Sequence, residues 1–237
     1  MPTKRPQFIN GKIYHVIVRG IGGQKTFLEE RDYLRYLLSL YKFNDKDPVL
    51  DRFYRREATP AIMTKAPKLE KPRDVLVEIL SLSLMPNHIH LLLRQLQDNG
   101  IPLFIQKLGG YSTYFNKYHK RFGSLFQRPF KAIHIEDDDQ LFIVTTYIHM
   151  NAIDLVEYDY KEKGISNPEK VIEFLKSHPW SSYPHYLGAE NISWLIDKDF
   201  LNKVFGGPDG FKEFVEARVY NKAKLKDFLK ESRVFLE

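Results

Sequence analysis

The sequence predicts an α+β fold in which helices cover a four-stranded antiparallel sheet. Short β-branched runs alternate with longer segments of helical periodicity, and their order is strand, helix, strand, strand, helix, strand. One more helical segment follows the last strand. The length of 237 residues and the hydrophobic content of 43% suit one domain with extensions, or two small domains.

The first strand is expected over residues 12–19, a β-branched run that ends at Gly20. A helix follows over residues 29–43. Its apolar residues recur at helical spacing: Tyr33, Leu34, Leu37, Leu38 and Tyr41. Residues 44–74 are polar and rich in proline, which predicts a long surface insertion that is helical in part.

A hairpin is predicted next, with strands over residues 74–84 and 88–94. The first run is rich in Val, Ile and Leu, the second resumes the extended pattern, and Pro86 lies between them. Proline suits the turn because it has no N–H to donate to a sheet.

The second helix is expected over residues 101–121, with a bend at the glycine pair 109–110. The fourth strand is expected over residues 130–135. Acidic residues at 137–139 then favour the start of a helix, because their side chains accept hydrogen bonds from its first N–H groups. This last helix is predicted over residues 139–156.

The order of elements is the ferredoxin-like βαββαβ pattern, with an added helix packed on the antiparallel sheet. We expect the main, ferredoxin-like domain to span residues 8–158, with the insertion at about 44–74. Residues 159–237 are expected to form a helical C-terminal extension, since helical segments alternate there with prolines.

The chain is basic, with a formal net charge of +6, which favours nucleic acid or an anionic membrane as partner. It has no cysteine, which excludes a disulfide framework, a thiolate zinc site and a cysteine nucleophile, and fits the reducing cytoplasm. The N-terminus lacks the apolar segment of a signal peptide, and no run approaches the roughly 18 apolar residues that span a bilayer. We therefore expect a soluble cytoplasmic protein with a nucleic-acid partner and no membrane partner.

Two histidines, His88 and His90, lie in the third predicted strand. Side chains at i and i+2 share one face of a strand, so both imidazoles point the same way while Ile89 points to the core. Such a pair can share one divalent ion, but it is too small for a closed structural zinc site. A metal here would keep open positions. The alternative is an exposed strand with two incidental histidines.

Tyr147 and Asn151 lie four residues apart in the last predicted helix and therefore stack on one helix face. A separate apolar stripe is expected to pack on the sheet: Leu141, Val144, Ile148, Ala152 and Leu155. A carboxamide oxygen suits a hard cation as a third ligand, and a tyrosine one turn earlier can reach a phosphate held on that cation. The alternative is a tyrosine at the core edge and an asparagine on the surface.

The stretch 100–135 contains no acidic residue and interleaves cations with aromatic rings. Cations neutralise phosphates and rings stack on unpaired bases, so this stretch indicates nucleic-acid binding. The rings are Tyr111, Tyr114, Phe115, Tyr118, Phe122, Phe126 and Phe130. The cations expected to contact DNA, including one at the end of the first strand, are Arg19, Lys117, Lys120, Arg121, Arg128 and Lys131. The alternative is an amphipathic core helix with a solvated basic face.

Five patches of the chain resemble the single-tyrosine HUH transposases, the enzymes of the smallest insertion sequences and of the REP-associated tyrosine transposases. Residues 85–93 (MPNHIHLLL) resemble the HUH motif, and residues 147–152 (YIHMNA) resemble the Tyr-Ile-x-x-Asn-Pro segment that carries the nucleophile. The flanking patches are residues 14–20, 123–131 and 180–183 (WSSY). The last of these favours the REP-associated branch.

The resemblance implies Mg²⁺ or Mn²⁺, cleavage of single-stranded DNA without ATP, and a covalent 5′-phosphotyrosine intermediate. It implies that His88, His90 and Asn151 hold the ion and that Tyr147 is the nucleophile. A phenol normally titrates near pH ~10, so this tyrosine requires activation. The expected substrate is hairpin-containing DNA ends in transposition or REP-element mobilisation, and relatives act as monomers or as homodimers.

One position departs from the resemblance, because Ala152 stands where the family usually has proline. Proline kinks a helix, so with alanine the last helix is expected to run on straighter past the site. The alternative function is a domesticated, non-catalytic nucleic-acid-binding protein that retains the fold. A replication or conjugation nickase is a third possibility, but the flanking patches match the transposases better.

Overall fold

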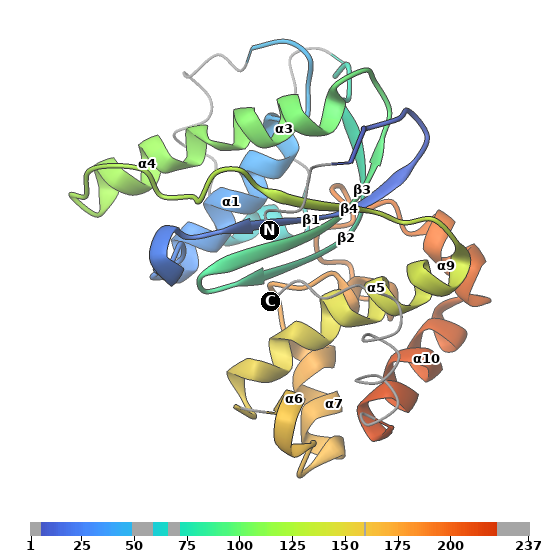
Figure 1. Cartoon of the computed structure of the whole chain (residues 1–237). Coiled ribbons are helices and arrows are strands. Elements are labelled where there is room, and N and C mark those ends of the chain that lie inside the picture. The colour runs from blue at the N-terminus through green and yellow to red at the C-terminus, as the bar shows by residue number, and fades with distance from the viewer. Residues whose placement is uncertain (1–5, 49–58, 66–71, 159, 222–237) are drawn as a thin grey trace.

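The computed structural model describes residues 6–48, 59–65, 72–158 and 160–221 (Figure 1). Its four-stranded antiparallel sheet has the order β2-β3-β1-β4, which is the strand order of a ferredoxin-like fold. The strands are β1 (Ile13–Arg19), β2 (Val77–Met85), β3 (His88–Gln95) and β4 (Lys131–His134). The predicted fold class is confirmed.

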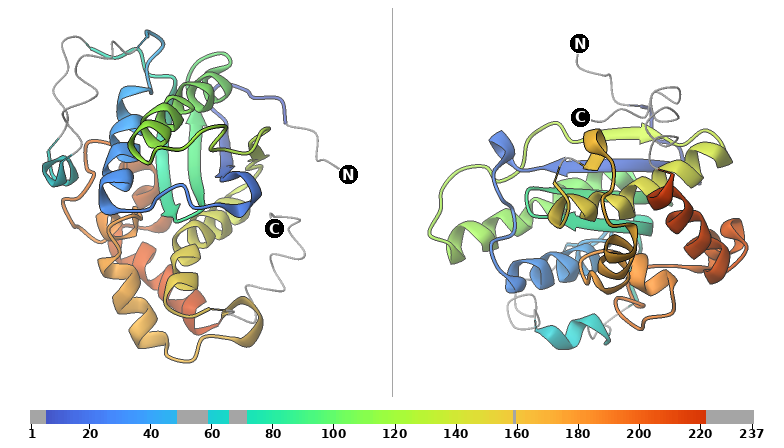
Figure 2. Two further views of the ribbon diagram at one scale, coloured as in Figure 1. Left: turned by 90° about the vertical axis from the view of Figure 1, so that its left-hand side faces the viewer. Right: turned by 90° about the horizontal axis from the view of Figure 1, so that it is seen from below.

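Helices cover both faces of the sheet (Figures 1 and 2). On one face lie α1 (Glu30–Lys42), α3 (Gly100–Leu108) and α4 (Gly110–Tyr118). On the other face lie α5 (Asp138–Met150) and the C-terminal helices. Because both faces are covered, almost every residue of β2 and β3 is buried.

The helix predicted over residues 101–121 is divided at Gly109 into α3 and α4, as the glycine pair suggested, and ends at Tyr118. Gly110 lies against α1, because a Cβ atom on Gly110 would sit only 3.0 Å from Cζ of Phe43. Lys120 has a φ of 51°, a left-handed conformation that a helix cannot contain, so the last predicted helical residues form a loop.

The last predicted helix starts as expected, with Asp137 accepting a hydrogen bond from the backbone of Gln140. Its α-helical part ends at Met150, and the chain continues as a 3-10 helix, η3 (Asn151–Leu155). The expected straight continuation past Ala152 is therefore wrong. The carbonyl of Met150, which would otherwise serve the next helical turn, accepts the hydroxyl of Tyr160 at 3.2 Å.

The insertion and the C-terminal extension pack against each other. Residues 49–58 and 66–71 of the insertion lie outside the described residues, and between them is the short 3-10 helix η2 (Pro60–Met63). Trp194 donates its indole N–H to the carbonyl of Ile62 at 2.6 Å. A further 3-10 turn, η1 (Ile21–Gly23), follows β1.

The described helices of the extension are α6 (Tyr160–Lys163), α7 (Pro168–Ser177), α8 (Tyr183–Tyr186), α9 (Asp199–Phe205) and α10 (Pro208–Tyr220). The domain boundary at residues 158 and 159 stays a prediction. Across the described parts of the chain, no helix combines the length and apolar character needed to cross a membrane.

The segment around Trp180 forms backbone hydrogen bonds to part of the edge strand β2. The backbone N–H of Leu84 donates to the carbonyl of Trp180 at 2.8 Å, and that of Ser182 donates to Leu82 at 3.0 Å. The Trp180 ring stacks on Tyr33 with 4.6 Å between ring centroids. Trp180 is thus a packing anchor that attaches the extension to the sheet.

Candidate active site

β3 and α5 bring three of the predicted site residues into one cluster. The register of the sheet places His88 opposite Arg19 of β1. The ring centroids of His88 and His90 lie 4.9 Å apart, and that of Tyr147 lies 5.6 Å from His90. Two histidines on one face of a strand therefore meet the tyrosine on the helix that covers this face.

Hydrogen bonds at the Nδ1 atoms orient the imidazoles of His88 and His90. Nδ1 of His88 lies 2.7 Å from Oδ1 of Asn87, an acceptor, so His88 donates from Nδ1. Nδ1 of His90 lies 2.8 Å from Nε2 of the buried His15. When His90 also donates from Nδ1, each histidine keeps the lone pair of its Nε2 atom.

Nε2 of His90 is buried and has no hydrogen-bond partner within the described residues. A buried polar atom without a partner is costly, and an ion bound at this nitrogen would remove that cost. The donor set of two imidazole nitrogens next to a phenol thus fits a catalytic metal with open coordination positions.

The electrostatics of the cluster keep the histidines neutral, which is the protonation state that binds metals. Burial, together with the positive charges of Arg19 and Lys161, lowers the pKa of His88 to about 4. The pKa of His90 lies well below its ordinary value, first because of burial and then because a charge on its ring would be repelled by neighbouring groups, His15, His88, Arg19 and Lys161.

Asn151 joins the cluster through the backbone of Tyr147. Its side chain is 1% exposed, and its Nδ2 donates to the carbonyl of Tyr147 at 2.7 Å. Asn151 thus lies one turn beyond the tyrosine, as its spacing required, with its amide nitrogen directed back to α5. Its role as a third metal ligand stays a prediction.

Lys161 of α6 is a site residue that the sequence analysis missed. Its Nζ lies 5.9 Å from the centroid of the Tyr147 ring and 3.5 Å from a carboxylate oxygen of Asp154. The sequence gives no signal for this lysine, because it lies in an acidic stretch 14 residues after the tyrosine. The helical extension therefore supplies a cation to the cluster.

The predicted DNA-contacting cations fall into two groups. Four are exposed: Lys117, Lys120, Arg128 and Lys131. Arg19 is half-buried beside the histidines. The guanidinium of Arg121 makes hydrogen bonds within the protein: it donates to Asn116, Gln24 and the carbonyl of Ser124. Contact of these residues with DNA stays a prediction.

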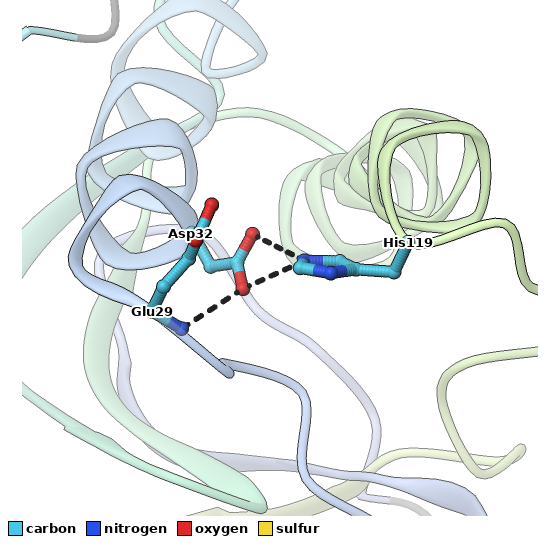
Figure 3. A group of neighbouring side chains, drawn as sticks. All are labelled: Glu29, Asp32 and His119. Atoms are coloured by element: carbon cyan, nitrogen blue, oxygen red, sulfur yellow. Dashed lines mark hydrogen bonds and ion pairs between the residues drawn. The ribbon is translucent and has the colours of Figure 1, made fainter.

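A second cluster of possible metal ligands, Glu29, Asp32 and His119, lies between α1 and α4 (Figure 3). Asp32 caps α1 by accepting the backbone N–H groups of Leu28 and Glu29, and it also accepts Nε2 of His119 at 3.0 Å. A capping box and an ion pair account for this arrangement. It lies on the opposite face of the sheet from α5.

This chain is similar both to a family model and to a solved structure. Residues 64–151 match the family model of IS200-like transposases, a span that contains His88, His90, Tyr147 and Asn151. The resemblance to the single-tyrosine transposases is thus confirmed over these residues.

One similar solved structure is that of a REP-associated tyrosine transposase bound to a REP hairpin. It shares 13% sequence identity with this chain and has a TM-score of 0.48, over 83% of this chain and 89% of the other. The comparison with curated protein sequences gives no match.

Proposed function

We propose that this protein nicks and rejoins single-stranded DNA through Tyr147, with the help of Mg²⁺ or Mn²⁺, and acts in DNA transposition or REP-element mobilisation. The observation that carries the proposal is the buried, unpartnered Nε2 atom of His90 beside His88 and the Tyr147 ring. A metal-binding face and a nucleophile thus occupy the same small volume.

His88 and His90 would hold the ion through their Nε2 atoms, and Asn151 is the proposed third ligand. The bound ion supplies Lewis-acid polarisation of the scissile phosphate. His15 fixes the His90 ring through Nδ1, so that Nε2 is the nitrogen left to bind the ion. Arg19 and Lys161 place two positive charges near the histidines, where a phosphodiester would lie.

In the cleavage step the phenol oxygen of Tyr147 forms a bond to phosphorus and loses its proton. The bond from phosphorus to the 3′ oxygen breaks, and that oxygen leaves with a proton as a free 3′-OH. The product is a 5′-phosphotyrosine, which retains the energy of the broken bond. Attack by another 3′-OH reverses the step, so the same site joins strands.

The test is a denaturing gel of the protein with labelled single-stranded DNA from the hairpin-containing regions that flank its gene, in the presence of Mn²⁺. We expect a slower protein–DNA band with the wild type and none with Tyr147→Phe. Tyr158→Phe is the matched control, because Tyr158 is 83% exposed and lies outside the ring cluster. Its adduct should equal that of the wild type.

A non-catalytic nucleic-acid-binding protein is the second candidate, favoured by the exposed cations of α4 and the loop that follows. It predicts a shifted DNA band on a native gel with no covalent adduct. Under that outcome the catalytic proposal fails. Single-stranded DNA as partner, a monomer or homodimer as the active form, and the cytoplasmic location stay predictions.

A further inference from the structure

The phenylalanine and tyrosine rings in the stretch 100–135 differ greatly in exposure. Tyr111 and Phe115 are buried in the core, where they cannot meet a ligand. Phe122 is 93% exposed, the highest value among the large hydrophobic side chains described. The Phe122 ring therefore makes little contact with the rest of the described chain, and its faces are open to a ligand.

The loop that carries Phe122 is braced on both sides of the ring. Arg121 donates to Oδ1 of Asn116 at 2.9 Å, to Oε1 of Gln24 at 2.8 Å and to the carbonyl of Ser124 at 2.9 Å. Asn116 in turn donates to the carbonyl of Gly123 at 2.7 Å. These bonds fix the residues before and after Phe122, so the loop presents the ring to solvent.

The charges near the ring suit a polyanion. Lys117 and Lys120 are exposed on the last turn of α4 and in the loop. No acidic residue lies between positions 100 and 135. Across from α4, the start of α1 carries Glu29 and Asp32, and the Asp32 carboxylate is bonded to His119.

The same loop is tied to the end of the sheet that carries the candidate active site. The N–H of Gln127 donates to the carbonyl of Arg19 at 2.8 Å, and the N–H of Gly20 donates to Asn87 at 2.8 Å. Asn87 orients His88. In Figure 1 the end of α4, the end of β1 and the β2–β3 turn all lie on the left. The loop continues from α4, on the face opposite α5, so a strand that extends from His88 around this end of the sheet would reach it.

We propose that Phe122 stacks on an unpaired base of the single-stranded DNA that flanks the cleavage site, while Lys117 and Lys120 bind the adjacent phosphates. A ring beside cations is the arrangement that proteins use to hold single strands, because every base offers a stacking face. The inference rests on the proposed function for the identity of its ligand.

The test measures binding of a fluorescein-labelled 20-nucleotide oligothymidylate in EDTA, so that no cleavage occurs. Phe122→Ala should weaken binding by about 5- to 150-fold, the range expected for loss of one base stack. Phe122→Trp should retain the affinity, and its added fluorescence should be quenched by the oligonucleotide. Wild-type titrations supply the background from Trp180 and Trp194.

A strand of the same length made of abasic units separates stacking from other effects. Without bases, the wild type and Phe122→Ala should bind equally. Lys120→Ala should instead lower the slope of log affinity against log salt by about one unit, while Phe122→Ala leaves it unchanged. Tyr220→Ala is the matched control, since Tyr220 is 55% exposed on α10, at the lower right of Figure 1.

The inference is overturned if Phe122→Ala binds oligothymidylate as tightly as the wild type does. It is also overturned if Phe122→Ala loses as much affinity for the abasic strand, because the ring would then act only by maintaining the shape of the loop. It is also overturned if light scattering shows that Phe122→Ala dissociates a dimer with DNA affinity unchanged. Adduct formation distinguishes the two proposals. If the wild type forms the Tyr147 adduct and Phe122→Ala binds and cleaves DNA equally well, only the inference about Phe122 fails. If the wild type neither binds nor cleaves DNA, both proposals fail.

Discussion

His15 is the residue through which the fold orients His90, since its Nε2 lies 2.8 Å from Nδ1 of that histidine. Groups behind a metal ligand fix its tautomer, and their loss typically weakens metal binding by about 10- to 100-fold. We expect His15→Phe to weaken Mn²⁺ binding by about that factor, measured by calorimetric titration.

The control for His15→Phe is His119→Gln, which alters the second cluster of possible ligands between α1 and α4. It should leave the Mn²⁺ affinity unchanged. If His119→Gln abolishes binding and His15→Phe does not, the ion binds at Glu29 and Asp32 and the assignment to His88 and His90 is wrong.

Lys161 is expected to act on DNA affinity rather than on stability. Its ion pair with Asp154 is about one-third exposed on both sides, and such pairs contribute little, within about 0.5 kcal/mol. Lys161→Ala should raise the KM for cleavage and lower the salt slope of DNA binding by about one, because one phosphate contact is lost. Lys161→Arg should restore both values, and failure of that rescue would count against a phosphate contact.

At the scale of the elements, the sequence predicted every strand of the sheet within a few residues, because each strand is a short run with apolar residues that is bounded by turn residues. The helices were less predictable. The division at Gly109 was visible as a glycine pair, but at the end of α5 the carbonyl of Met150 accepts a hydrogen bond from Tyr160 of α6, beyond the intervening η3. Local periodicity does not contain such a contact.

Asp32 at the start of α1 gives a prediction about stability. Its carboxylate is fully buried and accepts two backbone N–H groups, the Tyr114 hydroxyl and His119. Asp32→Ala removes the cap and leaves these donors unpaired, so the free energy of unfolding should fall by about 2–4 kcal/mol in urea melts. Glu30→Gln, an exposed acid on the same helix, should change it by less than about 0.5 kcal/mol. Equal decreases in the free energy of unfolding for the two variants would show that the Asp32 cap does not stabilise the protein more than an exposed acid does.

For the whole molecule, buried histidines predict that stability falls in acid. Burial lowers the pKa of His178 to about 4, and those of His15 and His149 to about 3. Below the ordinary value of about 6.5 the unfolded chain takes up protons that the folded chain does not. The free energy of unfolding is therefore highest above that pH and falls by about 1.4 kcal/mol per pH unit for each such histidine as the pH drops toward its folded pKa.

His178 offers the cleanest measurement of this effect, because it lies in the extension and away from the histidine cluster. The loss of stability between pH 7 and pH 5 should be about 1–2 kcal/mol smaller in His178→Gln than in the wild type. Urea melts at the two pH values give the difference. Identical losses would mean that the pKa of His178 is the same in the folded and unfolded states.

The candidate site was predictable from the sequence as far as local spacing reaches. His88 and His90 share a face because they are two residues apart on a strand, and Tyr147 and Asn151 because they are four apart on a helix. The bond from His15 to His90 joins residues 75 positions apart, so no local pattern reveals it. The same holds for Lys161 and for the brace of the Phe122 loop, which become visible only when the chain is folded.

The covering of β2 by the segment around Trp180 has a consequence for how copies of this protein can associate. The outer strands of a sheet offer backbone groups to which a strand of another molecule can pair, a common route to aggregation. Here residues 82–84 of β2 already pair with residues 180–182, and β4, at the other edge, is only four residues long and follows Pro129. Extension of the sheet from copy to copy is thereby disfavoured, so a dimer of this chain would join through its helices or loops.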